Sequence, residues 1–139
     1  MRIMAIDYGD AHTGIAISDP TGFLAGFTTV IDAYRPEVVV ERIADLAKEH
    51  GVEELVLGHP INMDGTRGPR SEKAQAMAQL LREATSLPVT LWDERRTTID
   101  AHQILMGSGK NAKKRKKVVD AVAASLILEG YLTFKKSQT

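Results

Sequence analysis

The sequence contains no cysteine, few aromatic residues and no long apolar run. Without cysteine the chain forms neither disulfides nor thiolate metal sites. Its four histidines lack the spacing of a zinc site, so any bound metal is expected to have oxygen ligands, which suits Mg²⁺ or Mn²⁺. No stretch of about 18 apolar residues is present to span a bilayer, and the apolar run at residues 3–6 is too short for a signal sequence. We therefore expect a cytoplasmic protein without a membrane partner.

The sequence also lacks net charge, because 18 Lys and Arg residues balance 18 Asp and Glu residues. This balance conceals an asymmetry along the chain. Residues 1–94 contain 8 basic and 15 acidic residues, a charge of −7, whereas residues 95–139 contain 10 basic and 3 acidic residues, a charge of +7. Such a division indicates that the basic part binds a polyanion.

The length and the apolar content predict one folded unit. With 139 residues, of which 43% are apolar and 26% charged, the chain is large enough to bury a core and is typical of a globular protein. We find no internal repeat and no linker. The sequence therefore predicts a single domain over residues 1–139, with a flexible tail at 133–139.

Hydrophobic patterning predicts an α/β fold. Short apolar or alternating runs near the N-terminus predict two close-set hairpins, and helices then alternate with strands. The expected order is a mixed sheet, with antiparallel N-terminal strands followed by βα units, flanked by helices. The predicted strands cover residues 3–7, 14–18, 23–31, 54–58 and 87–92, and the predicted helices begin at Pro36, at Ser71 as a capping residue, at Thr97 or Thr98, and near Val119.

Three acidic positions are candidates for metal binding and catalysis. Asp7 ends the first predicted strand, Asp93 and Glu94 follow the last one, and Asp120 lies early in the last helix. Ligands of open α/β sheets bind beyond the carboxyl ends of the strands. Carboxylates that converge there need a cation to offset their repulsion. Each acid taken alone is also consistent with a turn, a helix cap or a surface ion pair.

A basic segment directly precedes Asp120. Lysine and arginine contacts to phosphates give salt-sensitive binding that depends little on sequence. The alternative is a flexible, solvated loop before the helix. The candidate phosphate-binding residues of this segment are Lys110, Lys113, Lys114, Arg115, Lys116 and Lys117.

Four motifs in a fixed order resemble one family. They are Asp7-Tyr8-Gly9 with Gly14, Gly58-His59-Pro60 running to Arg70, Asp93-Glu94-Arg95-Arg96-Thr97-Thr98, and Asp120-Ala121-Val122-Ala123-Ala124. Together they resemble the YqgF/RuvX family of pre-16S ribosomal RNA nucleases, which is related to the RuvC-type Holliday junction resolvases.

The resemblance covers the chain from Arg2 to about Leu132. It implies a ribonuclease-H-like fold and divalent metals held by Asp7, Glu94 and Asp120. It favours Glu94 over Asp93, a choice that strand alternation alone leaves open. Substrate contacts are implied for the loop containing Arg67 and Arg70, and Arg95 is a further candidate. The family usually has a basic residue where this chain has His12, which we expect to be an exposed loop residue.

The resemblance predicts a two-metal-type hydrolase that cleaves structured nucleic acid, with precursor ribosomal RNA as the substrate and a monomer or homodimer as the active form. A Holliday junction resolvase acting on branched DNA uses the same chemistry and is the first alternative. A non-catalytic nucleic-acid-binding module is the second. A nucleotide-binding phosphotransferase of this sheet topology needs another domain, for which the chain has no room.

Overall fold

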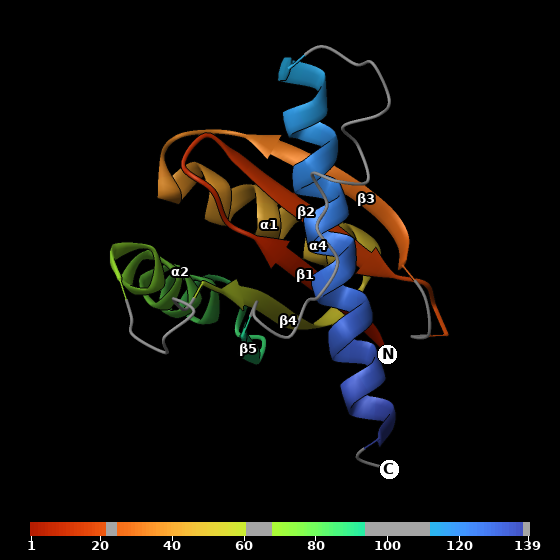
Figure 1. Cartoon of the computed structure of the whole chain (residues 1–139). Helices are drawn as coiled ribbons and strands as arrows, with labels where there is room; N and C mark the ends of the chain where they lie inside the picture. Colours follow the sequence, from red (N-terminus) through yellow and green to blue (C-terminus); the bar gives the residue numbers. More distant parts are fainter. Residues whose placement is uncertain (22–24, 61–67, 94–111, 138–139) are drawn as a thin grey trace.

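The computed structural model describes residues 1–21, 25–60, 68–93 and 112–137, with side chains in the last range from residue 121 onward. A five-stranded sheet forms the centre, and helices pack on both of its faces (Figure 1). Within the described ranges, no helix has both the length and the apolar character needed to cross a membrane.

The strand order is β3-β2-β1-β4-β5. β1 pairs antiparallel with β2, and β2 pairs antiparallel with β3, so the two predicted hairpins are confirmed. β4 and β5 add in parallel on the other side of β1, which confirms the mixed sheet. The strands are β1 (Arg2–Asp7), β2 (His12–Ser18), β3 (Ala25–Asp32), β4 (Val52–His59) and β5 (Val89–Asp93).

Two helices cover one face of the sheet. α1 (Pro36–His50) begins with a proline, whose missing N–H costs nothing at a helix start. It ends at Gly51, which has φ 65°, a conformation that glycine adopts without strain. α2 (Pro69–Thr85) packs against α1, β4 and β5. Both helices bury an apolar stripe at helical spacing, represented by Ile43 and Met77.

The opposite face is covered by α4 (Ala112–Ser137) (Figure 1). Strand alternation distributes the side chains of β1 between the two cores. Met4 and Ile6 join the cluster beneath α1 and α2, whereas Ile3 and Ala5 join the cluster beneath α4. Successive residues of β1 therefore contact the two helix layers in turn.

The last helix is longer than the sequence predicted, at both ends. Lys113–Lys117 lie in its first turns, so this part of the basic segment is helical and not a loop before the helix. The tail predicted at 133–139 was wrong as far as Ser137, because α4 continues to that residue. Phe134 packs on the apolar cluster beneath α4, which explains why the helix does not end earlier.

A buried carboxylate anchors the C-terminal half of α4 to the sheet. Glu54 of β4 is 7% exposed; the Tyr131 hydroxyl donates a hydrogen bond to it, and Lys135 Nζ lies 2.7 Å from its Oε1. Burial and the bond to Glu54 raise the pKa of Tyr131, and the bond to Glu54 raises the pKa of Lys135. A buried charge is tolerated when it is paired in this way.

Candidate active site at the carboxyl ends of the strands

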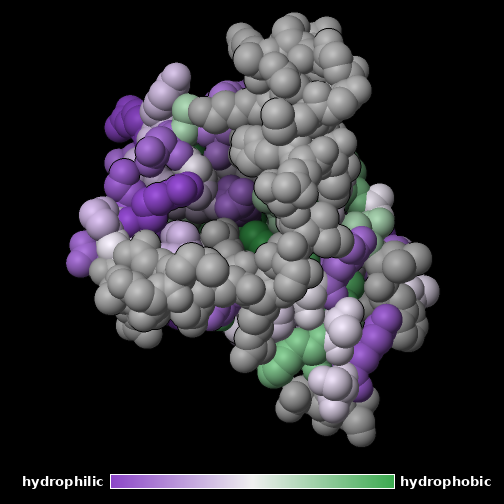
Figure 2. All heavy atoms as spheres, viewed as in Figure 1, coloured by the Kyte–Doolittle hydropathy of each residue, from purple (hydrophilic) through white to green (hydrophobic). Residues whose placement is uncertain are grey.

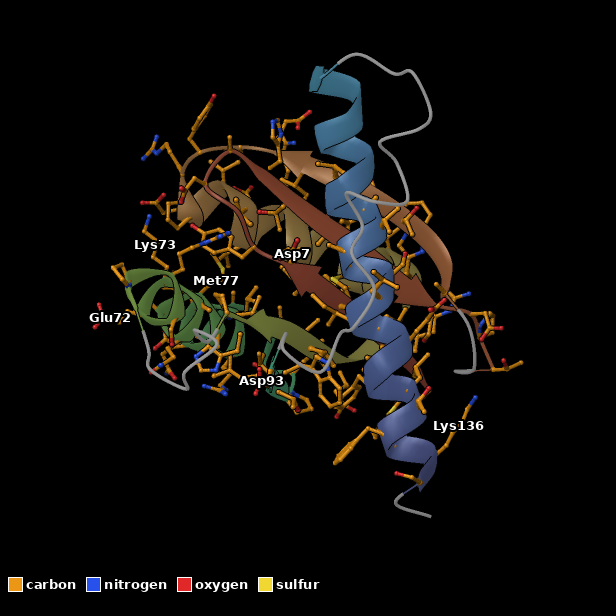
Figure 3. The ribbon with its side chains drawn as sticks, viewed as in Figure 1. Asp7, Glu72, Lys73, Met77, Asp93 and Lys136 are labelled. Carbon is orange, nitrogen blue, oxygen red and sulfur yellow. The ribbon has the colours of Figure 1, made fainter. Side chains whose placement is uncertain are left out.

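Three parallel strands end at the same edge of the sheet. β1 ends at Asp7, β4 at His59 and β5 at Asp93. Asp7 and Asp93 come from the two strands that flank β4 (Figure 3). This is the edge at which sheets of this kind bind their ligands.

Asp7 belongs to the face that α4 covers. Its side chain alternates with the buried Ile6 and shares the face of Ala5. Gly14 of β2 pairs with Asp7 and has no side chain to occupy the space beside it. The carboxylate is only half-buried, which leaves it accessible from the carboxyl edge.

Asp93 lies on the opposite face. Trp92 belongs to the cluster beneath α4, and Leu91 packs on the cluster beneath α1 and α2. Asp93 therefore alternates onto the α1 and α2 face, in register with His59. Asp93 and Asp7 thus belong to different faces of the sheet, and Asp93 is poorly placed to share a metal with Asp7. Glu94 lies outside the described residues.

The backbone of α4 includes Asp120, whose side chain is not among those described. Ala124, one turn later, is fully buried against the sheet. Within the described part of the chain, no group of three or more acidic or histidine side chains is placed to hold a metal. Of the three predicted ligands, the structure describes the side chain of Asp7 alone.

The turn after β1 is tightly constrained. A Cβ atom on Gly9 would lie 2.4 Å from the backbone oxygen of His12, closer than any real contact. Only glycine therefore fits this turn without moving the backbone. Tyr8 precedes it, and burial followed by the nearby charge of Asp10 raises the pKa of its hydroxyl. The tyrosine hydroxyl is consequently neutral near pH 7.

His12 was predicted to be an exposed loop residue, and this was wrong. It is the first residue of β2, and its Nδ1 lies 2.6 Å from Oδ1 of Asp32 on β3. The side chain of His12 is only 20% exposed. Strand pairing places the two residues opposite each other, which explains the contact.

His59 and Ser71 form a buried contact that the sequence did not reveal. Nε2 of His59 lies 2.6 Å from Oγ of Ser71, and Gln75 donates a further hydrogen bond to the same oxygen. Ser71 was predicted to cap α2, but the helix begins at Pro69 and Ser71 is fully buried within it. The contact joins the end of β4 to the first turn of α2.

Replacement of Ser71 by alanine is expected to destabilise the protein by about 1–3 kcal/mol, because a buried ring nitrogen of His59 loses this partner. Urea unfolding of wild type and Ser71→Ala measures the difference. Gln79→Ala, on the same helix but exposed, is the control and should cost under about 0.5 kcal/mol. Equal midpoints for Ser71→Ala and wild type would contradict the structural role of the contact.

Basic side chains surround this edge on the described part of the chain. Arg70 lies exposed in the first turn of α2, and Lys73 Nζ lies 3.1 Å from Asp10 Oδ1. Hydrophilic side chains gather over the β1–β2 turn and the starts of α1 and α2 (Figure 2). The predicted contacts Arg67, Arg95 and Lys110 lie outside the described residues, and of Lys113–Lys117 only the backbone is described.

A mixed sheet of this order, with its acidic residue at the end of the central strand and helices on both faces, defines a ribonuclease-H-like fold. Solved structures agree. The chain resembles RuvC of Thermus thermophilus in complex with a Holliday junction substrate, with a TM-score of 0.65 at 15% identity over 97% of this chain and 96% of that one. It also resembles the fowlpox virus Holliday junction resolvase, with a TM-score of 0.57 at 18% identity over all of both chains.

Sequence comparison identifies the family. The family model for RuvX, described as Holliday junction resolvase, matches residues 1–134. A protein of Halothermothrix orenii, named "Putative pre-16S rRNA nuclease", is 45% identical over 97% of this chain and 96% of its own length. One of Geobacillus kaustophilus with the same name is 43% identical over 98% of this chain and 100% of its own. The chain belongs to the RuvX family, as its four motifs predicted.

Proposed function

We propose that this protein is a metal-dependent endonuclease that hydrolyses phosphodiester bonds in structured nucleic acid, and that it processes the 5′ end of precursor 16S ribosomal RNA. The name of the relatives that match nearly the whole chain supports this substrate. The observation that carries the proposal is the position of Asp7, half-buried at the end of β1 on the face beneath α4. The enzyme acts in the cytoplasm, as a monomer or a homodimer.

The proposed catalytic carboxylates are Asp7, Glu94 and Asp120. Residues four apart on an α-helix share a face, so position 120 lies on the side of α4 that buries Ala124. Continued alternation beyond Trp92, which belongs to the cluster beneath α4, favours Glu94 over Asp93 as the partner of Asp7. In this proposal the three acids share the face that carries Asp7.

The chemistry of this set fits Mg²⁺ or Mn²⁺. All three proposed ligands are carboxylates, and the chain has no cysteine to attract softer metals. Divalent cations of a two-metal site supply an activated water and stabilise the leaving oxygen of a phosphodiester. Of the three, Asp7 lies opposite Gly14, so its neighbour on β2 carries no side chain that would compete with such an ion.

The proposed nucleic-acid surface combines the edge of the sheet with the start of α4. Lys113–Lys117 lie in the first turns of that helix, ahead of position 120. Arg70 adds an exposed cation at the start of α2, where backbone N–H groups also favour anions. Arg67, Arg95 and Lys110 complete the proposed contacts. Phosphate contacts of this kind recognise the backbone and not the bases.

Resolution of branched DNA remains the second candidate, because the structural likeness includes a RuvC bound to a Holliday junction. One cleavage experiment separates the two. A labelled precursor 16S RNA 5′-end fragment and a four-way DNA junction are each incubated with the protein in Mg²⁺, in Mn²⁺ and in EDTA. We expect metal-dependent cutting of the RNA. Cutting of the junction alone would favour the resolvase, and binding without cutting of either substrate would favour a non-catalytic module.

A further inference from the structure

A hollow of about 400 Å³ opens beside the candidate active site, on the α1 and α2 face of the sheet. It lies between the β1–β2 turn, the segment before α1 and one side of α2. Lys73 and Met77 lie on the side of α2 toward this turn, whereas Glu72 points away from it (Figure 3). The residues that matter for its chemistry are Tyr8, Asp10, Tyr34, Lys73, Met77 and Leu80.

We propose that this hollow binds one unpaired nucleobase of the substrate strand, next to the bond that is cleaved. The proposal rests on the proposed function, because it assigns a place to part of that substrate. Tyr34 lines the hollow and is 80% exposed, so its ring is accessible to a ligand. Tyrosine rings stack on bases of any identity.

The lining of the hollow has an apolar part and a polar part, as the binding of a planar base requires. Met77 is buried and Leu80 is 40% exposed, so they form an apolar floor. Asp10 and Lys73 form a polar rim, with side chains 84% and 59% exposed. An ion pair so exposed is weak, so both groups remain available to a ligand. A carboxylate accepts a hydrogen bond from an exocyclic amino group of a base, and an ammonium group binds the adjoining phosphate.

Continuity with the active-site edge points to a nucleic acid as the occupant. Tyr8 directly follows Asp7 but alternates onto the other face of the sheet. A smaller pocket shares Tyr8, Asp10 and Lys73 with the hollow and extends to Arg70 at the start of α2. A strand that leaves Asp7 and passes over the edge of the sheet therefore meets both cations and tyrosine rings.

Binding of RNA to the full-length protein without metal tests the proposal, since no cleavage is needed. The probes are a fluorescein-labelled hairpin with a single-stranded flank, the same hairpin with abasic positions throughout the flank, and a blunt hairpin. Anisotropy titrations compare wild type with Tyr34→Ala and Tyr34→Phe. Phe27→Ala is the matched control, because it removes an exposed ring from β3, whose residues do not line the hollow.

We expect Tyr34→Ala to weaken binding of the flanked hairpin by roughly tenfold, the usual effect of losing one base–aromatic stack. Tyr34→Phe and Phe27→Ala should bind like wild type. The abasic and blunt hairpins should bind wild type and Tyr34→Ala equally. Equal affinity of wild type and Tyr34→Ala for the flanked hairpin would overturn the proposal, as would an equal loss on the abasic hairpin. Failure of the nuclease proposal is distinguished separately, by absence of metal-dependent cleavage while this Tyr34-dependent binding persists.

Discussion

Replacement of Asp7 by asparagine is expected to lower the rate of metal-dependent cleavage by on the order of 10³-fold, the scale seen when a directly acting group is lost. The substitution keeps the shape of the side chain but removes its charge, so a divalent cation loses a ligand. Because Asp7 is half-buried and sits at the end of β1, the fold should tolerate the change. Initial rates with saturating enzyme measure the effect.

Asp93→Asn is the matched control for this experiment. It makes the same chemical change at the end of a neighbouring strand, on the face away from Asp7. We expect its rate to stay within a few-fold of wild type, whereas Glu94→Gln should resemble Asp7→Asn. A loss in Asp93→Asn as large as that in Asp7→Asn would reverse the assignment of Glu94. Unchanged cleavage by Asp7→Asn would refute the proposed catalytic site.

Neutralising the basic turns of α4 is expected to have the second largest effect. Changing Lys113, Lys114, Arg115, Lys116 and Lys117 to glutamine removes up to five cation–phosphate pairs while keeping good helix formers. Removal of each pair reduces the slope of log Kd against log salt by roughly 0.7–0.9. The slope should therefore fall by up to about 4, and affinity at low salt should fall most. Binding titrations at several salt concentrations measure both quantities.

The control for this experiment is a variant of α1, the helix on the other face of the sheet. Arg42 and Lys48 of α1 are exposed and lie outside the proposed binding surface, so Arg42→Gln with Lys48→Gln should leave the slope unchanged. An unchanged slope in the five-residue variant would show that α4 does not bind phosphates. Its basic turns would then be an ordinary solvated helix start.

Local patterning was sufficient to predict most of the fold. The apolar run of β1 and the apolar stripe of α1 are both short-range signals, and both elements formed where they were expected. The start of α2 and the end of α4 were harder to predict, because they depend on contacts that sequence spacing does not contain. Ser71 has the chemistry of a capping residue, yet its partner is His59, from a strand that ends before the preceding loop. Similarly, Phe134 extends α4 by packing on the sheet.

The candidate site was predictable only in part. The place of Asp7 at the end of an apolar strand could be predicted from the pattern, but alternation in the sequence left Asp93 and Glu94 open, and the family resemblance favoured Glu94. Buried neighbours such as Trp92 identify the two faces of the sheet and support the same proposal. The hollow at Tyr34 depends on three separate segments meeting, for which one sequence carries no signal. The contact of Glu54 was not predictable, because β4 contains two adjacent acids, Glu53 and Glu54, and the sequence does not indicate which of them is buried.

The ribosome makes α4 after the strands that this helix covers, and this order affects the folding of the nascent chain. The apolar face of Ile3, Ala5, Ala16 and Val56 is covered by residues 124–132, which are made more than sixty residues after the last of these four. A growing chain can pair β1 with β2 early, but that face stays in contact with water until α4 leaves the ribosome. Uncovered apolar sheet surface attracts other chains and chaperones. The final helix therefore decides how long each nascent molecule is exposed to aggregation.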